Sequence, residues 1–474
     1  MSAQGTAIAE KSQPEAMDLR TRKLLEGPLF RTLIGLAAPN ALVMVTQIAM
    51  GLVELYFVAK LGVDALAGVS QVFPVLALVG ALSQGAVGGG VVSAIARSLG
   101  KGDREGANNF VWYVVAIAIA LGLLTTALLK FVGPHFYASM GTSGDSLAAA
   151  LTYSSVIFGG AIFIWLFNLL LAVIRGTGNL VLPVIVVCGG ALLLIPLLPL
   201  LILGTDQIPG LGVTGGAFGV LTYYALGSLV LIFYLWSHRG VVHPPARPPR
   251  LRFRPAWEIL RVSGMSALVS ASTNLTLAIL TSFVGSYGTT AVAGYGAGAR
   301  LEFIIVSLSY GIGGPAGILI GTNVGAGNYR RALRIAWIGV LVAGFAAEAI
   351  GLTAAYWPNV WLEVFSSDPA VLTTGSAYLR TVGPFFGFFG IGYALYCAGQ
   401  GTGRMEWPVT GALVRAVVAI AGSFLVLHIN GDLIGIFRAA SIGMMTFGCL
   451  SLPSLGLRVG YGRSDKRPAS IGSG

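Results

Sequence analysis

The chain has 474 residues, of which 55 % are hydrophobic and only 10 % charged, and its mean hydropathy is +0.82. This composition excludes an ordinary soluble globular domain. The formal net charge is +11. Three cysteines within apolar runs and four histidines without ligand spacing indicate neither a disulfide framework nor a metal site.

Twelve apolar segments are long enough to cross a bilayer, whose ~30 Å of hydrocarbon needs about 20 residues. We therefore predict an all-α integral membrane protein with twelve transmembrane helices. The segments are 30–58, 64–97, 107–133, 147–174, 180–203, 213–237, 257–286, 290–322, 332–358, 371–399, 407–428 and 433–457.

Positive charge predicts the orientation. When the N-terminus is placed inside, only Lys60 and Lys130 of the 29 Lys and Arg residues fall in outward loops. We expect a cytoplasmic N-terminal segment at 1–28 rather than a cleavable signal, a proline-rich cytoplasmic linker at 238–256 and a cytoplasmic tail at 458–474. The protein is then a multi-pass protein of the plasma (inner) membrane. Its net charge reflects topology, so nucleic acid is not an expected partner.

The first predicted helix carries a polar stripe. Asn40, Gln47 and Glu54 recur every seven residues, which at 100° per residue returns to within about 20° of one face. An acid within an apolar span costs about 2.5–3.5 kcal/mol on insertion scales and marks a functional site by default. Glu54 is therefore our candidate ion-coupling and substrate residue. The alternative is an interfacial Glu54 that pairs with Lys60.

Three polar residues of the predicted fourth and sixth helices are candidates to assist Glu54. They are Asn168, Thr214 and Tyr223. Each residue type is more often a helix-packing hydrogen-bonding group than a ligand.

The two halves of the chain repeat each other. Three landmarks of the first half return in the second half in the same order and with nearly the same spacing, which indicates two six-helix lobes at 29–237 and 257–457 that enter the membrane in the same sense. Internal duplication in a membrane chain is typical of a transporter with alternating access. The pairs are 62–68 with 288–294, 98–104 with 323–329, and 175–179 with 400–404.

The second lobe carries the other intramembrane charges, and two interpretations of them stay open. They either form ion pairs that lock the lobe together or line the substrate cavity. No phosphate-binding loop accompanies them, so we expect no nucleotide-driven transport. The residues are Arg300, Glu302, Glu348, Arg380, Arg415 and Arg438.

Several motifs together resemble one known family, the multidrug and toxic compound extrusion (MATE) transporters. The resemblance covers about residues 25 to 455. It implies two six-helix lobes around a central cavity and export of organic compounds in exchange for protons or sodium. It also implies that Glu54 occupies the place of an aspartate that takes up the coupling ion, and that Pro39 is a hinge. The motifs are Leu25-Glu26-Gly27-Pro28-Leu29, Leu52-Val53-Glu54-Leu55-Tyr56, Ala94 to Gly100, and Ile320 to Ala332.

Two family patterns are missing. Alignment on Pro199 puts Leu194 and Leu198 where the proton-coupled members carry Asn and Asp. The acids of the sodium-linked members are absent from 263–286 and 383–400. The coupling ion, H+ or Na+, therefore stays open.

We expect a monomeric secondary active transporter, not an enzyme, that exports small organic compounds from the lipid bilayer environment and needs no cofactor beyond the coupling ion. A carboxylate in a dry cavity can hold a proton or a cationic amphiphile, so we expect cationic amphiphilic substrates. The alternative is a flippase for a lipid-linked precursor of the same broader superfamily. Arg300, Arg380 and Arg415 keep that alternative open, because such flippases place several basic residues in the cavity.

Overall fold

The computed structural model describes residues 18–139, 143–205, 207–237, 239–250, 252–429 and 431–456. The predicted tail at 458–474 and most of the N-terminal segment lie outside these residues. The helices are α1 (Leu19–Glu26), α2 (Leu29–Ala59), α3 (Val63–Gly80), the π-helix η1 (Ala81–Val87), α4 (Gly88–Gly100), α5 (Arg104–Ser139), α6 (Gly144–Gly159), α7 (Ala161–Gly176), α8 (Val181–Leu203), α9 (Val213–Trp236), α10 (Phe253–Gly285), α11 (Thr289–Gly325), α12 (Tyr329–Tyr356), α13 (Pro358–Leu362), α14 (Pro369–Val382), the 3-10 helix η2 (Gly383–Phe385), α15 (Phe386–Thr402), α16 (Glu406–His428), α17 (Leu433–Ser451) and the 3-10 helix η3 (Leu452–Leu455). Two short strands, β1 (Gly204–Thr205) and β2 (Ile208–Pro209), form a hairpin.

The predicted membrane spans are confirmed. Within the described residues, eleven helices are long and apolar enough to cross a membrane, and α6 with α7 forms a further span that is bent by 51°. The outer faces of these helices carry large apolar side chains such as Leu52, Val45 and Phe345, which are 64 %, 62 % and 79 % exposed. Such residues suit a hydrocarbon solvent.

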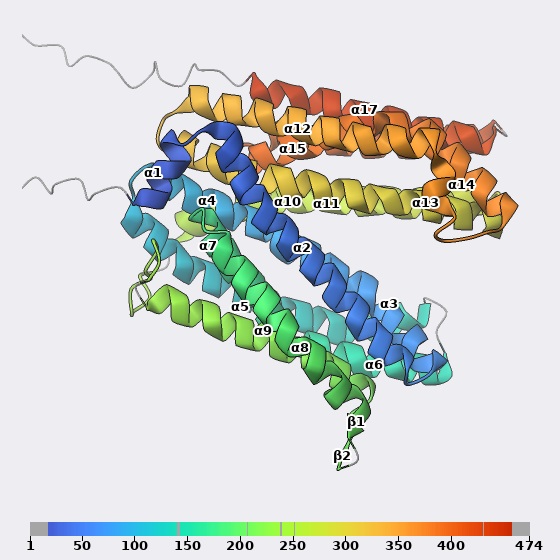
Figure 1. Cartoon of the computed structure of the whole chain (residues 1–474), viewed down its shortest axis with the longest axis horizontal. Helices are drawn as coiled ribbons and strands as arrows, with labels where there is room; N and C mark the ends of the chain where they lie inside the picture. The colour runs from blue at the N-terminus through green and yellow to red at the C-terminus, as the bar shows by residue number, and fades with distance from the viewer. Residues whose placement is uncertain are drawn as a thin grey trace, which may run out of the picture.

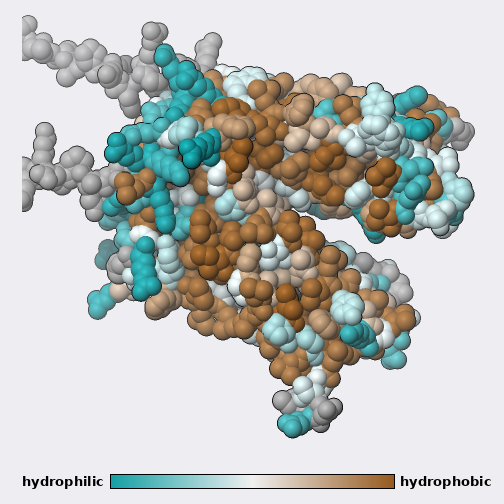
Figure 2. Space-filling model, viewed as in Figure 1, coloured by the Kyte–Doolittle hydropathy of each residue, from teal (hydrophilic) through white to brown (hydrophobic). Residues whose placement is uncertain are grey.

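The helices form two lobes, α2–α9 and α10–α17, which meet at one end and diverge toward the other (Figure 1). Figure 2 shows the cleft between the diverging ends, and hydrophilic residues gathered at the end where α1 lies. Each lobe has its own apolar core. The cleft opens away from the end that carries α1.

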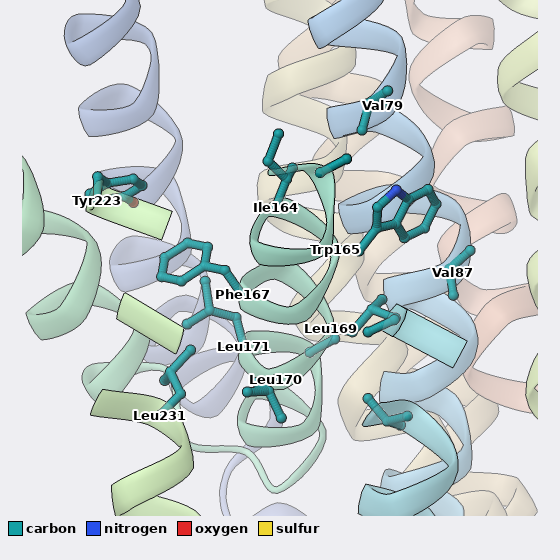
Figure 3. Close-up of a cluster of buried hydrophobic side chains, with 14 of the residues drawn as sticks. Val79, Val87, Ile164, Trp165, Phe167, Leu169, Leu170, Leu171, Tyr223 and Leu231 are labelled. Atoms are coloured by element: carbon teal, nitrogen blue, oxygen red, sulfur yellow. The ribbon is translucent and has the colours of Figure 1, made fainter. Parts of the chain in front are cut away.

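Helix α7 lies at the centre of the N-terminal lobe. In Figure 3, Trp165 points toward Val87, while Phe167 points toward Tyr223 of α9. The Phe167 and Tyr223 ring centroids are 5.2 Å apart. Trp165 and Phe167, two residues apart and so on opposite faces of α7, meet different neighbouring helices. Helices pack on all sides of α7, so nearly all of its residues are buried.

The repeat is visible as reciprocal contacts between the lobes. Gly100 of α4 packs on the backbone carbonyl of Thr322, and Gly325 of α11 packs on that of Arg97. Gly100 and Gly325 are equivalent positions of the repeat, and so are Arg97 and Thr322. The same contact is thus made twice with the roles of the two lobes exchanged, which indicates a two-fold axis between the lobes. The close approach requires glycine at both crossings, because an added Cβ would overlap the carbonyl oxygen.

The segment between the lobes is held along α5. The Trp112 indole donates to the Pro245 carbonyl at 2.9 Å, and the Arg252 amide donates to the Tyr113 hydroxyl at 2.8 Å. These bonds attach the connection to the first turns of α5, beside the closed end of the molecule.

Candidate functional site

Glu54 lies inside the N-terminal lobe. It belongs to α2 and is only 3 % exposed. The Tyr153 hydroxyl of α6 donates a hydrogen bond to Glu54 Oε1 at 2.5 Å. On the α9 side, a methyl group added to Gly216 would lie 3.6 Å from Oε1 and 3.7 Å from Val58. The carboxylate is therefore enclosed by three helices.

No cation pairs with Glu54 among the residues that the structure describes. Lys60, which could have paired with an interfacial Glu54, instead places its ammonium 4.8 Å from the Tyr56 ring and 5.4 Å from the Phe57 ring. Burial without an ionic partner is costly for a carboxylate, and uptake of a proton or cation removes that cost. This geometry suits a coupling site.

None of the three predicted assistants has a hydrogen bond to Glu54 in the described structure. Asn168 donates to Ser83 Oγ at 2.8 Å. Tyr223 packs against Phe167 and Gly190, and its hydroxyl is buried without a described partner. Thr214 is partly exposed in the first turn of α9. The tyrosine that does reach Glu54 is Tyr153.

Sequence reasoning did not find Tyr153, although the repeat held a signal for it. Its equivalent in the second half of the repeat is Tyr378 of α14. The Tyr378 hydroxyl also donates to a partly buried glutamate, Glu302 of α11. Equivalent tyrosines therefore bind a carboxylate in each lobe, but the glutamates come from non-equivalent helices.

The other two residues of the predicted stripe lie nearer the closed end. Asn40 and Gln47 line one cavity within the N-terminal lobe, together with Gln84 and Arg175. Asn40 and Arg175 also line a second cavity between the lobes. The polar stripe of α2 therefore has two parts. Glu54 is enclosed within the lobe, whereas Asn40 and Gln47 lie beside Arg175. Pro39, the predicted hinge, lies within α2 next to Asn40.

The basic residues of the C-terminal lobe do not gather in one cavity. Arg415 is buried over the Phe389 ring at 4.8 Å and donates to Thr273 Oγ1 at 3.3 Å. It shares a small internal cavity with Glu302. Arg300 and Arg380 are exposed.

A family model, MatE, matches residues 39–200 and 266–425, once in each lobe. The chain belongs to the MatE family. Its sequence relatives include an FAD transporter of Shewanella oneidensis, 26 % identical over 78 % of this chain and 81 % of that protein. They also include the multidrug export protein MepA of Staphylococcus aureus, 26 % identical over 86 % of this chain and 89 % of that protein.

Solved structures have the same fold. A MOP superfamily transporter from Pyrococcus furiosus superposes with a TM-score of 0.85 at 23 % identity, over 94 % of this chain and 99 % of that chain. A multidrug resistance MATE transporter described as outward-facing superposes with a TM-score of 0.83 at 24 % identity, over 94 % and 99 % of the two chains. The likeness of fold agrees with the match to the family model, which identifies the protein as a MATE transporter and not an enzyme.

Proposed function

We propose that this MATE protein exports organic compounds in exchange for a coupling cation that binds at Glu54. The observation that carries the proposal is the enclosed carboxylate, which has a single hydroxyl donor and no described cationic partner. When the Glu54 carboxylate gains or loses charge, the packing of α2 against its neighbours changes. A coupling cation that favours one arrangement of the lobes through this change can drive export.

The surroundings of Glu54 favour a proton over sodium as the coupling ion. Transporter sodium sites use backbone carbonyls of unwound helix. Residues 29–59 and 213–236 are continuous α-helix, so the carbonyls near Glu54 already accept helix hydrogen bonds. A proton needs only the carboxylate itself.

The names of the relatives leave open whether the substrate is a cation or an anion. The Staphylococcus relative is named for multidrug export, whereas the Shewanella relative is named for FAD, which is an anion. The expectation of a cationic amphiphile required Glu54 to face the substrate. Glu54 is instead enclosed within its lobe in this conformation, so the substrate contacts other residues here.

The flippase alternative needs several basic residues in one cavity. Among the described residues, Arg300 lies 5.0 Å from the Phe365 ring at the surface and Arg380 is exposed. Arg415 is enclosed in its own lobe. This separation favours the exporter.

The test is efflux from proteoliposomes with an imposed gradient. Glu54→Gln should abolish efflux driven by either ion, and Glu54→Asp should retain part of it. The pH gradient and the sodium gradient are imposed separately, and the proposal expects the pH gradient to support efflux. Ethidium, a cation, norfloxacin, a zwitterion, and fluorescein, an anion, are tested in parallel because the charge of the substrate is open, with reconstituted protein quantified for each variant.

Glu363→Gln is the control, because Glu363 is an exposed acid outside the membrane-spanning helices. It should retain full efflux. Full efflux in Glu54→Gln would overturn the assignment of the coupling site, and efflux driven by sodium alone would overturn the choice of ion.

A further inference from the structure

Arg175 is a buried cation at the C-terminal end of α7. It is 8 % exposed, and it forms no ion pair within the described parts of the chain. Its guanidinium is hydrogen-bonded to the Tyr310 hydroxyl across the lobe interface. Its Nε, however, is buried without a hydrogen-bond partner in the described structure. The positive charge is therefore only partly satisfied.

Asn40 adds a second unsatisfied donor at the same place. It is 5 % exposed, and its Nδ2 also lacks a described partner. Asn40 and Arg175 both line the cavity between the lobes and the adjoining cavity within the N-terminal lobe. The two cavities are small, about 20 and 10 Å³ in this conformation, so the two buried donors provide a polar end for a ligand group and not a pocket for a whole ligand.

The walls of the two cavities contain no acid among the described residues. The polar lining consists of amides, hydroxyls and one guanidinium, and apolar side chains such as Val92 and Ile318 complete it. The polar lining residues are Asn40, Gln47, Gln84, Ser93, Arg175, Tyr310 and Gln400. A cationic group would find no counter-charge there, whereas an anionic group would find one.

Comparison of the two halves shows that packing of the lobe interface does not need the positive charge of Arg175. The equivalent of Arg175 in the second half is Gln400, and the equivalent of Tyr310 in the first half is Gly85. Gln400 Nε2 donates to the Gly85 carbonyl at 2.8 Å, which mirrors the contact of Arg175 with Tyr310. A neutral amide thus closes one side of the interface, and only the N-terminal lobe brings a charge to it.

We propose that Arg175 and Asn40 bind the anionic group, a carboxylate or phosphate, of an amphiphilic organic substrate whose apolar body lies between the lobes. A guanidinium matches the planar, bidentate geometry of such oxyanions, and an amide N–H adds a third donor. The inference rests on the proposed function and names its substrate class. Since the site joins residues of both lobes, separation of the lobes at this end removes Tyr310 and Gln400 from the anion.

The test is equilibrium binding to purified protein in nanodiscs. Fluorescein and rhodamine 6G share the xanthene ring system but carry opposite charge, and fluorescence anisotropy follows both. The wild type should bind fluorescein more tightly than rhodamine 6G. Arg175→Gln should weaken fluorescein binding at least about tenfold, the effect of one lost charge-assisted contact, and leave rhodamine binding unchanged. Arg175→Lys should retain part of the affinity.

Two further variants keep the test decisive if Arg175→Gln does not fold. Asn40→Asp places a carboxylate beside Arg175 and should exclude fluorescein while it strengthens rhodamine 6G binding. Arg334→Gln removes an exposed arginine of α12 and should change neither affinity. Equal losses for both dyes in Arg175→Gln, unchanged fluorescein binding in Asn40→Asp, or tighter wild-type binding of the cation would overturn the proposal.

Binding at equilibrium needs no ion gradient, so the result is independent of the coupling mechanism. Anion binding without gradient-driven efflux would refute the proposed function and leave this site standing. Gradient-driven efflux in a protein whose Arg175→Gln variant loses affinity for both dyes equally would refute the anion site and leave the proposed function standing.

Discussion

The Tyr153 hydroxyl is the one described group that donates a hydrogen bond to Glu54, and the bond is charge-assisted only while the carboxylate is ionised. Proton uptake by Glu54 therefore weakens the link between α2 and α6. Loss of this link changes how α2 packs, which gives the proton a direct effect on the helix that also carries Asn40.

Removal of that donor should impair coupling. Hydrogen bonds to charged groups contribute about 1.5–3 kcal/mol, so Tyr153→Phe should slow gradient-driven efflux about 10- to 100-fold while folding is retained. Proteoliposome efflux measures the change. Tyr137→Phe is the matched control, because its buried hydroxyl pairs with neutral Ser154 at 3.0 Å. Equal rates for the two variants would contradict a coupling role for Tyr153.

In the C-terminal lobe Arg415 is buried and Arg380 is exposed, so their replacement should affect stability differently. Arg415→Gln leaves Glu302 without its positive neighbour and removes the stacking on Phe389, so the free energy of unfolding should fall by about 3 kcal/mol. Arg380→Gln should change it by no more than about 0.5 kcal/mol. Thermal melting in detergent compares them. A stable Arg415→Gln protein with lost substrate binding would instead place Arg415 in the substrate site.

Sequence reasoning found Glu54 because an acid in an apolar span is costly wherever it lies. The repeat pairs Tyr153 with Tyr378, but tyrosine is common in membrane helices, and only the tertiary contact shows that this one reaches Glu54. For Arg175, the charge pattern indicates only a position at the cytoplasmic side. Its burial depends on the second lobe covering it, which no local pattern shows.

At the scale of single helices, α2 combines the coupling residue and a proline. Pro39 lacks an amide hydrogen, so the helix has one backbone hydrogen bond fewer at this point and bends there more easily. Bending at Pro39 would move Asn40 relative to the lobe interface.

Pro39→Ala should restore that hydrogen bond and stiffen α2. We expect severalfold slower efflux with unchanged equilibrium binding of the substrate. Pro74→Ala, which changes a proline inside α3, is the control and should transport normally. Weakened binding with a normal transport rate per bound substrate would argue against a hinge at Pro39.

The helices themselves were largely predictable, because a long run of apolar residues has one stable form in a bilayer. The predicted spans differ from the helices mainly by a few residues at their ends. The break at Gly160, where an added Cβ would meet Leu221 at 2.6 Å, was not predicted. A hydropathy pattern predicts neither this bend nor the π-helical turn at 81–87, because both depend on the packing of neighbouring helices.

For the whole molecule, the orientation in the membrane is the open prediction. The closed end, which holds the connection between the lobes, should face the cytoplasm. In a protein without native cysteines, an impermeant maleimide applied to intact cells should label Ser367→Cys and leave Arg247→Cys unlabelled. Both positions are exposed. Ser367 lies between α13 and α14, which Figure 1 shows at the end away from α1, and Arg247 lies in the segment between α9 and α10 that is held along α5. Permeabilised cells provide the control, and the opposite labelling pattern would reverse the assigned direction of transport.

The reciprocal glycine contacts have a consequence for the history of the chain. A parallel homodimer of one six-helix ancestor would be joined by the same crossing made twice, Gly100 with Thr322 and Gly325 with Arg97. In such a dimer every substitution would alter both subunits together. Fusion of the two genes removed that constraint. Within one chain the two halves can differ, as they do at this interface, where position 175 is arginine and the equivalent position 400 is glutamine.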